Sequence, residues 1–315
     1  MRDRLRQWSL APDGRPRPDA PFGRGPIAAR VLARVIDAAA FAGSRVPVSV
    51  AHALAVIGGH TEWALRSRKR AVLATNLGHA VGAHPRTPIV RRLVRREVVN
   101  EARRSADLLW ATGRPDEFVA TTAVTGDEHT RAALESGRGV VLAGVHLGGW
   151  ELAVGLPAAL FGVPSTVVVA DDWLAWAMQH VRSRAGLNMT APSAALSAAR
   201  ALRRGEIAIV FGDDARAGPR RHEVPFCDST ASLPAGTVAL AQMTGAVLVP
   251  FAVVPLGPRR WHAVLDHPIE PPARGAGEDE IVGVLTDLTA RWSAFITAHP
   301  EHWAAVFPID WGAGA

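Results

Sequence analysis

The sequence predicts an α/β fold in which helices flank a central sheet that is mostly parallel or mixed. The chain of 315 residues is long enough to bury one large α/β core. From about residue 113, short apolar runs alternate with segments of helical length and periodicity. Apolar strands that alternate with helices indicate a sheet buried on both faces, at least partly parallel.

The N-terminal third is predicted to be helical after a mobile arm. Residues 1–25 contain several prolines, glycines and arginines with little apolar periodicity, which is typical of a mobile arm. Helices are expected at Pro26–Ser44, Val48–Ile57, Glu62–Leu77 and Pro88–Trp110. The first three helices are short and apolar with basic residues at their edges, which is typical of helices that attach to a membrane interface. Packing on the domain core explains each of these helices, taken alone, equally well.

The rest of the chain is expected to form the sheet and its flanking helices. We therefore separate a helical, membrane-associating part at 26–112 from an α/β core at 113–315, and expect 26–315 to form one structural domain. Strands are predicted at Gly139–Val145, Ser165–Ala170, Ile207–Phe211, Val247–Val254 and Trp261–Leu265. Helices are predicted at Glu128–Ser136, Trp150–Leu160, Trp173–Ala185, Ala194–Arg203, Ala235–Thr244 and Glu278–Ala298.

Composition limits the location and the kind of site. Hydrophobic residues make up 48% of the chain, yet no window offers the roughly 18 consecutive apolar residues that a spanning helix needs. The single cysteine, Cys227, excludes an internal disulfide and a multi-cysteine zinc cage. No signal peptide is recognised, so the default expectation is a cytoplasmic location.

The positive charge is carried almost entirely by arginine. The formal net charge is +6 and Lys69 is the only lysine. Arginine binds phosphate in a bidentate way, so nucleic acid, anionic lipid headgroups or a phosphate-bearing cofactor would fit. The arginine-rich helix 88–110 lacks the interleaved aromatic residues of a single-strand binding platform, so we expect no nucleic-acid partner.

The stretch GVVLAGVHLGGWE (139–151) carries the strongest chemical signal. His146 follows an apolar strand, at the sheet edge where ligands of open α/β sheets bind. Gly148 and Gly149 allow a tight turn and close approach by a substrate. Glu151, in the first turn of the next helix, is close enough to fold back onto Nδ1 of the imidazole. The pair would then be a general base and its orienting carboxylate, with no protein nucleophile required.

The residues alone leave a second interpretation open, in which a structural histidine ends the strand and a glutamate favours the helix dipole. Rival catalytic motifs are missing from the sequence. It contains no G-x-S-x-G elbow, no H-E-x-x-H zinc helix and no Walker A loop, and we expect no metal or cofactor.

An ordered series of segments resembles the bacterial lipid A late acyltransferases and the related phosphatidylinositol mannoside acyltransferases. The segments are RSRKRAVLATNL (66–77), RREVVNEARRSADLLW (95–110), GVVLAGVHLGGWE (139–151), HVRSRAGLN (180–188), VPFCDSTASLPAGTVALAQMTGAVLVPFAV (224–253) and HPEHW (299–303). The resemblance covers about residues 60–305. It implies a glycerolipid-acyltransferase-like fold and transfer of a fatty acyl group from acyl-CoA or acyl carrier protein to a glycolipid hydroxyl. The reaction would take place at the cytoplasmic face of the plasma membrane, where anionic lipids would also bind the protein.

The resemblance also implies roles for individual residues. His146 would deprotonate the acceptor and Glu151 would orient it. Arg182, or alternatively Arg184, would bind phosphate or the charge that develops at the thioester carbonyl. Asp228 lies where relatives often carry a glutamate, and it would hold the histidine or the acceptor.

Three points of the resemblance leave alternatives. Relatives often carry an Asp-Arg-Asp-like run, which Asp213 matches, whereas the other residues of that run are shifted in this sequence. The arginine-rich, lysine-poor and alanine-rich composition favours a phosphatidylinositol mannoside acceptor, as in high-GC Gram-positive bacteria, with a lipid A precursor as the alternative. A non-catalytic protein that binds anionic lipids is an alternative of another class, against which the intact His-x4-Glu speaks.

Overall fold

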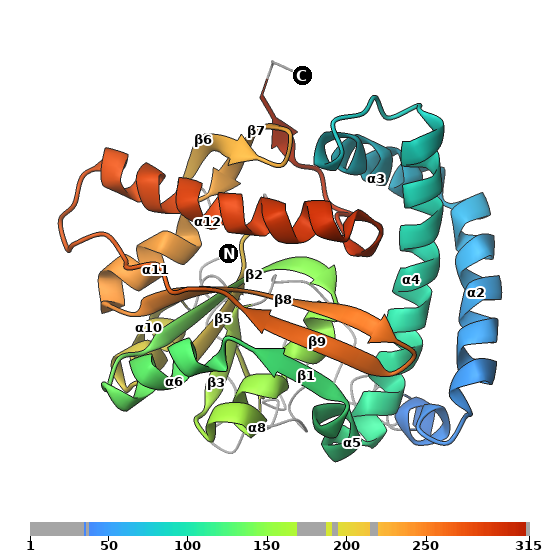
Figure 1. Ribbon diagram of the computed structural model, residues 1–315, viewed down its shortest axis with the longest axis horizontal. Coiled ribbons are helices and arrows are strands. Elements are labelled where there is room, and N and C mark those ends of the chain that lie inside the picture. The colour runs from blue at the N-terminus through green and yellow to red at the C-terminus, as the bar shows by residue number, and fades with distance from the viewer. Residues whose placement is uncertain (1–34, 36–37, 169–186, 191–194, 215–219, 313–315) are drawn as a thin grey trace, which may run out of the picture.

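A central sheet of seven strands forms the middle of the protein (Figure 1). The computed structural model describes residues 35, 38–168, 187–190, 195–214 and 220–312. The strands of this sheet are β1 (Thr122–Thr125), β2 (Val140–Gly148), β3 (Ser165–Val168), β4 (Leu187–Thr190), β5 (Ile207–Phe211), β8 (Val247–Gly257) and β9 (Arg260–Leu265). Their spatial order is β1-β9-β8-β2-β5-β3-β4, and all neighbours are parallel except β8 and β9. The predicted α/β fold with a mixed, mostly parallel sheet is confirmed.

Strand β2 separates two hydrophobic clusters, because alternate side chains of a strand point to opposite faces. Val141 and Ala143 belong to one cluster, and Val140 and Leu142 to the other. The first cluster contains side chains of α10 (Ala195–Arg203), α11 (Gly236–Thr244) and α12 (Glu278–Ala298). The second contains side chains of α7 (Trp150–Ala153) and α8 (Leu156–Phe161), and α6 (Asp127–Glu135) packs against it. The sheet is therefore buried on both faces, as the apolar strands predict.

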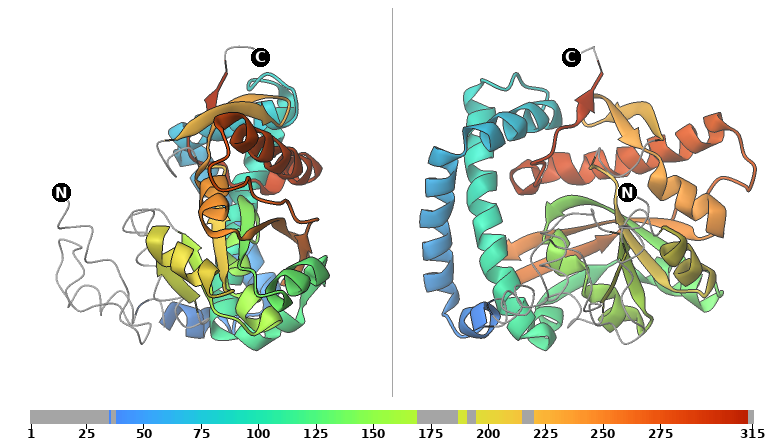
Figure 2. Two further views of the ribbon diagram at one scale, coloured as in Figure 1. Left: turned by 90° about the vertical axis from the view of Figure 1, so that its left-hand side faces the viewer. Right: turned by 180° about the vertical axis from the view of Figure 1, so that it is seen from behind.

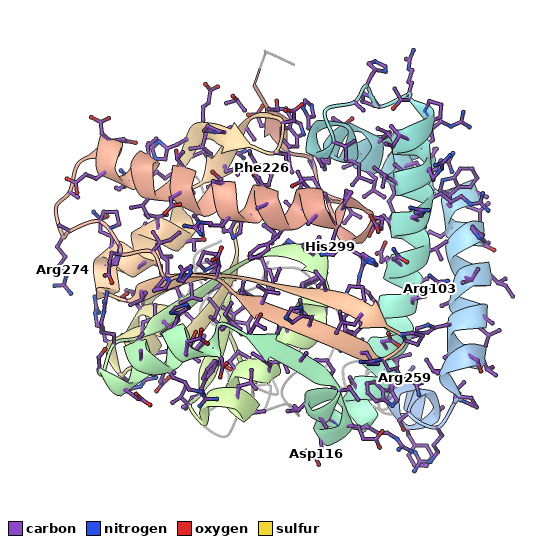
Figure 3. All side chains as sticks on the ribbon, viewed as in Figure 1. Arg103, Asp116, Phe226, Arg259, Arg274 and His299 are labelled. Carbon is purple, nitrogen blue, oxygen red and sulfur yellow. The ribbon has the colours of Figure 1, made fainter. Side chains whose placement is uncertain are left out.

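Four helices stand at one edge of the sheet, with α10 toward the other edge (Figures 1 and 2). This helical layer consists of α2 (Val48–Leu65), α3 (Ser67–Ala80), α4 (Pro88–Gly113) and α5 (Pro115–Ala120). The hairpin of β8 and β9 reaches into it (Figure 3): Arg259 donates a hydrogen bond to the Val46 carbonyl at 3.0 Å, and its guanidinium carbon lies 5.0 Å from the Trp110 ring centroid. The helical layer is thus packed directly against the sheet.

A small antiparallel sheet lies above α12 and next to α3 (Figure 1). It contains β6 (Arg221–Phe226), β7 (Ser229–Pro234) and β10 (Asp310–Trp311), in the order β10-β7-β6. The chain reaches β10 from α12 through the short 3-10 helix η4 (Pro300–His302). The C-terminal residues therefore return to the middle of the protein before they join this sheet.

Several predicted boundaries are wrong for identifiable reasons. Helix α2 continues past Ile57 to Leu65, because Gly59 lets it pack directly on the backbone of Val99 in α4. The helix predicted at Trp150–Leu160 is divided into α7 and α8, and the second begins with Leu156-Pro157, where proline is tolerated only in a first turn. Strands β1, β4, β6, β7 and β10 are not among the predicted strands.

Some predictions fall outside the described residues: the mobile arm, most of the helix Pro26–Ser44, the helix Trp173–Ala185 and the end of the strand Ser165–Ala170. Residues 38–43 are helical. In the part of the chain that the structure describes, no helix combines the length and apolarity needed to cross a bilayer.

Candidate active site

Parallel pairing of β2 with β5 brings His146 next to Asp213. The paired residues at the end of the ladder are Gly144 and Phe211, and the Gly212 amide then donates to the Gly144 carbonyl at 3.0 Å. His146 and Asp213 each lie two residues beyond the Gly144–Phe211 pair, so the register makes them neighbours. Both lie at the carboxyl edge of the sheet, where open α/β sheets bind their ligands.

The Asp213 carboxylate is fully buried and accepts three hydrogen bonds. Its Oδ1 lies 2.7 Å from Nδ1 of His146. Its Oδ2 accepts the His146 backbone amide at 3.0 Å and the indole N–H of Trp303 at 2.9 Å. A carboxylate held by several donors has one orientation, so Asp213 fixes the plane of the imidazole.

These contacts also determine the tautomer of His146. An ionised carboxylate can only accept hydrogen bonds, so the 2.7 Å contact requires a proton on Nδ1. In the neutral ring the lone pair then lies on Nε2. The imidazole is 17% exposed, whereas Asp213 is 0% exposed. His146 therefore has the form of a general base held by a buried acid.

Three aromatic rings surround the imidazole. The ring centroids of Trp150, Phe211 and Phe307 lie 4.6, 5.0 and 5.1 Å from that of His146. Trp150 and Phe307 meet it nearly edge to face. Aromatic walls of this kind limit access of water and provide π faces that stabilise an imidazolium ion.

The C-terminal segment completes the site from the opposite side. Trp303 forms an antiparallel bridge with Leu147, and the Ala304 amide donates to the His146 carbonyl at 2.8 Å. Trp303 is 0% exposed, and its indole N–H is the one that Asp213 accepts. The sequence contained a signal for this contact in HPEHW, but nothing in that motif indicates which residue the tryptophan binds.

The position of Glu151 differs from the prediction. It was expected to hold Nδ1 of His146, and Asp213 occupies that nitrogen instead. The reason is that β2 continues as a strand through Gly148 and pairs in parallel with β5, so Nδ1 of the imidazole meets a residue that follows β5. Glu151 lies in the first turn of α7, is partly buried, and has the charge that suits a helix N-terminus.

Gly148 and Gly149 serve the packing of the sheet. Gly148 has a φ of +55°, and a Cβ there would overlap the Val253 carbonyl. The Gly149 amide donates to that same carbonyl at 2.7 Å, and a Cβ at Gly149 would press against the ring of Trp261. Both residues are buried. The tight turn is therefore as predicted, but the space that the glycines leave is filled by β8 and β9.

Asp228 was predicted to hold the histidine or the acceptor, and Nδ1 of the histidine is held by Asp213 instead. Asp228 is exposed at the turn between β6 and β7, where its amide donates to the His79 carbonyl at 3.1 Å. Its carboxylate lies against Gly82, where a Cβ would collide with it. Burial, together with the smaller effect of the Asp213 and Asp228 charges, raises the pKa of the neighbouring Cys227 to about 12, so this thiol is not a nucleophile at neutral pH.

Arg182 and Arg184 lie outside the described residues. Among the described residues, no group of three or more histidine, cysteine, aspartate or glutamate side chains is arranged to hold a metal ion.

Comparisons with known proteins agree with the sequence segments described above. A family model described as bacterial lipid A biosynthesis acyltransferase matches residues 35–308. The lipid A biosynthesis lauroyltransferase of Escherichia coli (strain K12) is 32% identical over 145 residues, which cover 44% of this chain and 46% of the relative. That match spans about half the length of the relative, whereas the family model extends over most of the chain and includes His146, Asp213 and Trp303. The chain therefore belongs to the bacterial lipid A biosynthesis acyltransferase family.

Proposed function

We propose that the protein transfers a fatty acyl chain from an acyl thioester to a hydroxyl group of a membrane glycolipid. The observation that carries the proposal is the buried Asp213 carboxylate 2.7 Å from Nδ1 of a partly exposed His146. A base of this kind suits direct deprotonation of a substrate hydroxyl. Membership of the acyltransferase family supports the same reaction.

In the proposed reaction His146 acts first as a base and then as an acid. Nε2 of His146 takes the proton of the acceptor hydroxyl as its oxygen attacks the thioester carbonyl. The tetrahedral intermediate then collapses, the carbon–sulfur bond breaks, and the imidazolium returns the proton to the leaving thiolate. Asp213 stabilises the imidazolium in between. For the oxyanion we propose Arg182, with Arg184 as the alternative, together with backbone amides.

The acceptor is proposed to be either a lipid A precursor or a phosphatidylinositol mannoside. The name of the E. coli relative favours the first and a lauroyl donor, whereas the arginine-rich composition favours the second. To distinguish them, purified protein would be given radiolabelled lauroyl-CoA or lauroyl acyl carrier protein with each lipid in turn. Transfer of label to one lipid identifies the acceptor. Absence of transfer to both, with thioester intact, would contradict the proposed function and favour a non-catalytic lipid-binding protein.

The helical layer is proposed to attach the protein to the cytoplasmic face of the membrane. Seven of the eleven large hydrophobic side chains that are exposed in the described part of the chain lie between residues 35 and 89. Helix α2 buries only Gly59 and carries Glu62 as its one acidic or basic residue other than histidine. It lies on the outer side of α4 (Figures 1 and 2). Four of its apolar side chains are exposed at helical spacing, here named the α2 strip: Val50, Leu54, Ile57 and Leu65.

The charges around the α2 strip suit an anionic surface. Arg45 precedes α2, and Arg66 and Arg68 follow it, all three exposed. Apolar side chains that enter the interface, with arginines at the level of the headgroups, are the usual arrangement of an interfacial helix. The membrane would thereby hold the protein where a glycolipid acceptor is found.

Aspartate at both Leu54 and Ile57 is expected to weaken binding to vesicles of phosphatidylglycerol and phosphatidylcholine about 100-fold, because each side chain contributes about 1.5 kcal/mol when it is buried. Flotation or co-sedimentation measures the binding. Leu196→Asp is the matched control, since Leu196 is 62% exposed and Leu54 is 63% exposed, but Leu196 lies on α10. Equal binding by the double variant and the control would contradict this docking surface.

A further inference from the structure

Asn76 binds the C-terminal segment at three points, although it belongs to α3 in the helical layer. Its Nδ2 donates to the carbonyl oxygens of Ala305 at 2.8 Å and Phe307 at 2.9 Å. Its Oδ1 accepts the indole N–H of Trp311 at 2.9 Å. The side chain is 1% exposed. All three hydrogen bonds of this buried amide therefore go to one short stretch of chain, which we name the C-terminal segment (residues 303–311).

The C-terminal segment contacts both members of the His146–Asp213 pair. Trp303 donates to the Asp213 carboxylate, Ala304 donates to the His146 carbonyl, and the Phe307 ring lies edge to face with the imidazole. Residues 304–309, between the bridge at Trp303 and β10, belong to no helix or strand. Buried carbonyl groups in such a stretch need partners from side chains. Asn76 supplies two of them: Ala305 follows the residue whose amide binds His146, and Phe307 is the residue whose ring contacts the imidazole.

The far end of the segment is held by the same helix. The ring of Trp311 stacks on His79 with centroids 4.1 Å apart, and His79 lies one turn after Asn76 in α3. The ring of Phe226 is also nearly parallel to that of Trp311, with centroids 5.8 Å apart. The segment is thus fixed to α3 at residues 305, 307 and 311, and it touches the catalytic pair through residues 303, 304 and 307.

We propose that Asn76 is a positioning residue for the acyl transfer, acting through the C-terminal segment on His146 and Asp213. The inference rests on the proposed function. An apolar residue could fill the space of Asn76 with less cost of burial, but it could not bind two carbonyls and one indole at once. Without the Asn76 amide, the segment is no longer held in one position against the imidazole. Small displacements of a catalytic base lower the rate by large factors.

Asn76→Ala is expected to lower kcat about 10- to 100-fold and to change KM for both substrates less than about twofold, because the misplaced groups act on the chemistry and not on substrate binding. Leu73→Ala is the control. Leu73 lies one turn earlier in α3 and is 0% exposed. Its truncation therefore destabilises the packing of the same helix but leaves the hydrogen bonds of the Asn76 side chain in place. We expect this control to keep kcat within about twofold of the unmodified protein, even if its Tm falls as far as that of Asn76→Ala.

Two further measurements keep the test decisive. Trp311→Phe keeps an aromatic ring in the stack and removes one of the three hydrogen bonds of Asn76, and it is expected to lower kcat about threefold. This variant tests the inference if Asn76→Ala folds poorly. The downfield proton NMR signal of the His146 imidazole, assigned by its loss in His146→Ala, is expected to broaden or shift in Asn76→Ala and to stay unchanged in Leu73→Ala.

The outcomes separate this inference from the proposed function. If His146→Ala is inactive while Asn76→Ala and Trp311→Phe keep the kcat of the control and an unchanged NMR signal, the positioning role is wrong and the proposed function stands. If the unmodified protein transfers no acyl group to either lipid, the proposed function fails. The NMR signal then still reports whether Asn76 orders the pair.

Discussion

Replacing His146 by alanine is expected to lower kcat for acyl transfer about 1,000-fold, with little change in Tm. A positioned general base contributes about 10²- to 10⁴-fold to the rate of such a reaction. The side chain is partly exposed and pairs with Asp213 at the edge of the sheet, so we expect its removal to affect the fold little. The rate would be measured as transfer of a radiolabelled lauroyl group from its thioester to the acceptor lipid, and folding as Tm by circular dichroism.

The matched control is His262→Ala. His262 is also partly exposed, and Nε2 lies 3.0 Å from the Thr125 hydroxyl on the neighbouring strand. It lies in β9 and not at the site, so this variant is expected to keep the rate within about twofold. Added imidazole is expected to restore part of the activity of His146→Ala only. A rate within tenfold of the unmodified protein in His146→Ala would remove His146 from the mechanism.

Much of the fold could be predicted because its elements carry local signals. The strand Ile207–Phe211 and the helix Glu278–Ala298 have the predicted boundaries. The apolar run before His146 correctly predicts a strand, although β2 continues past the predicted end at Val145 to Gly148. Strands β1 and β4 have four residues each and lie at the two edges of the sheet. They were missed because such short segments have too few residues for a periodicity to be read.

The partner of His146 could not be predicted in the same way. Glu151 was chosen because it is near in sequence, but Asp213 is 67 residues away and reaches His146 through the pairing of β2 with β5. Strand order and register depend on how the whole core packs, and no local pattern around either residue specifies them. The same is true of Trp303 and Phe307. Trp303 binds Asp213 and Phe307 contacts the imidazole from a C-terminal segment that is more than 80 residues away in the sequence and is held by Asn76 and β10.

The second large effect is expected for Asp213→Asn, which should lower kcat about 10²- to 10⁴-fold. Asparagine has the same shape but offers one acceptor and one NH₂ donor. Oδ1 of Asp213 faces one donor, the Nδ1 proton of His146, and Oδ2 faces two, the His146 amide and the Trp303 indole. Whichever way the amide is turned, its NH₂ group confronts a donor.

The less costly orientation places the NH₂ group toward Nδ1, since only one donor is then opposed. The imidazole must accept there, so its proton moves to Nε2 and the base is lost. This is the wrong-tautomer effect known from the aspartate of serine protease triads, where the same substitution costs about 10⁴-fold. The downfield imidazole signal is expected to disappear, and raising the pH would not restore the rate, because the neutral ring already has its proton on the wrong nitrogen.

Two variants distinguish this effect from a general loss of negative charge. Asp228→Asn removes an exposed carboxylate that also lies near Cys227, and it is expected to keep the rate within about threefold. Glu151→Gln is expected to leave the downfield signal in place whatever it does to the rate, because Glu151 does not hold Nδ1. If Glu151→Gln abolished the signal and Asp213→Asn preserved it, the orienting role would belong to the glutamate.

Asp213 also binds the Trp303 indole, so the loss of rate in Asp213→Asn should be less than additive with the loss in Trp303→Phe. The effects of Asp228→Asn and Trp303→Phe on the rate should add.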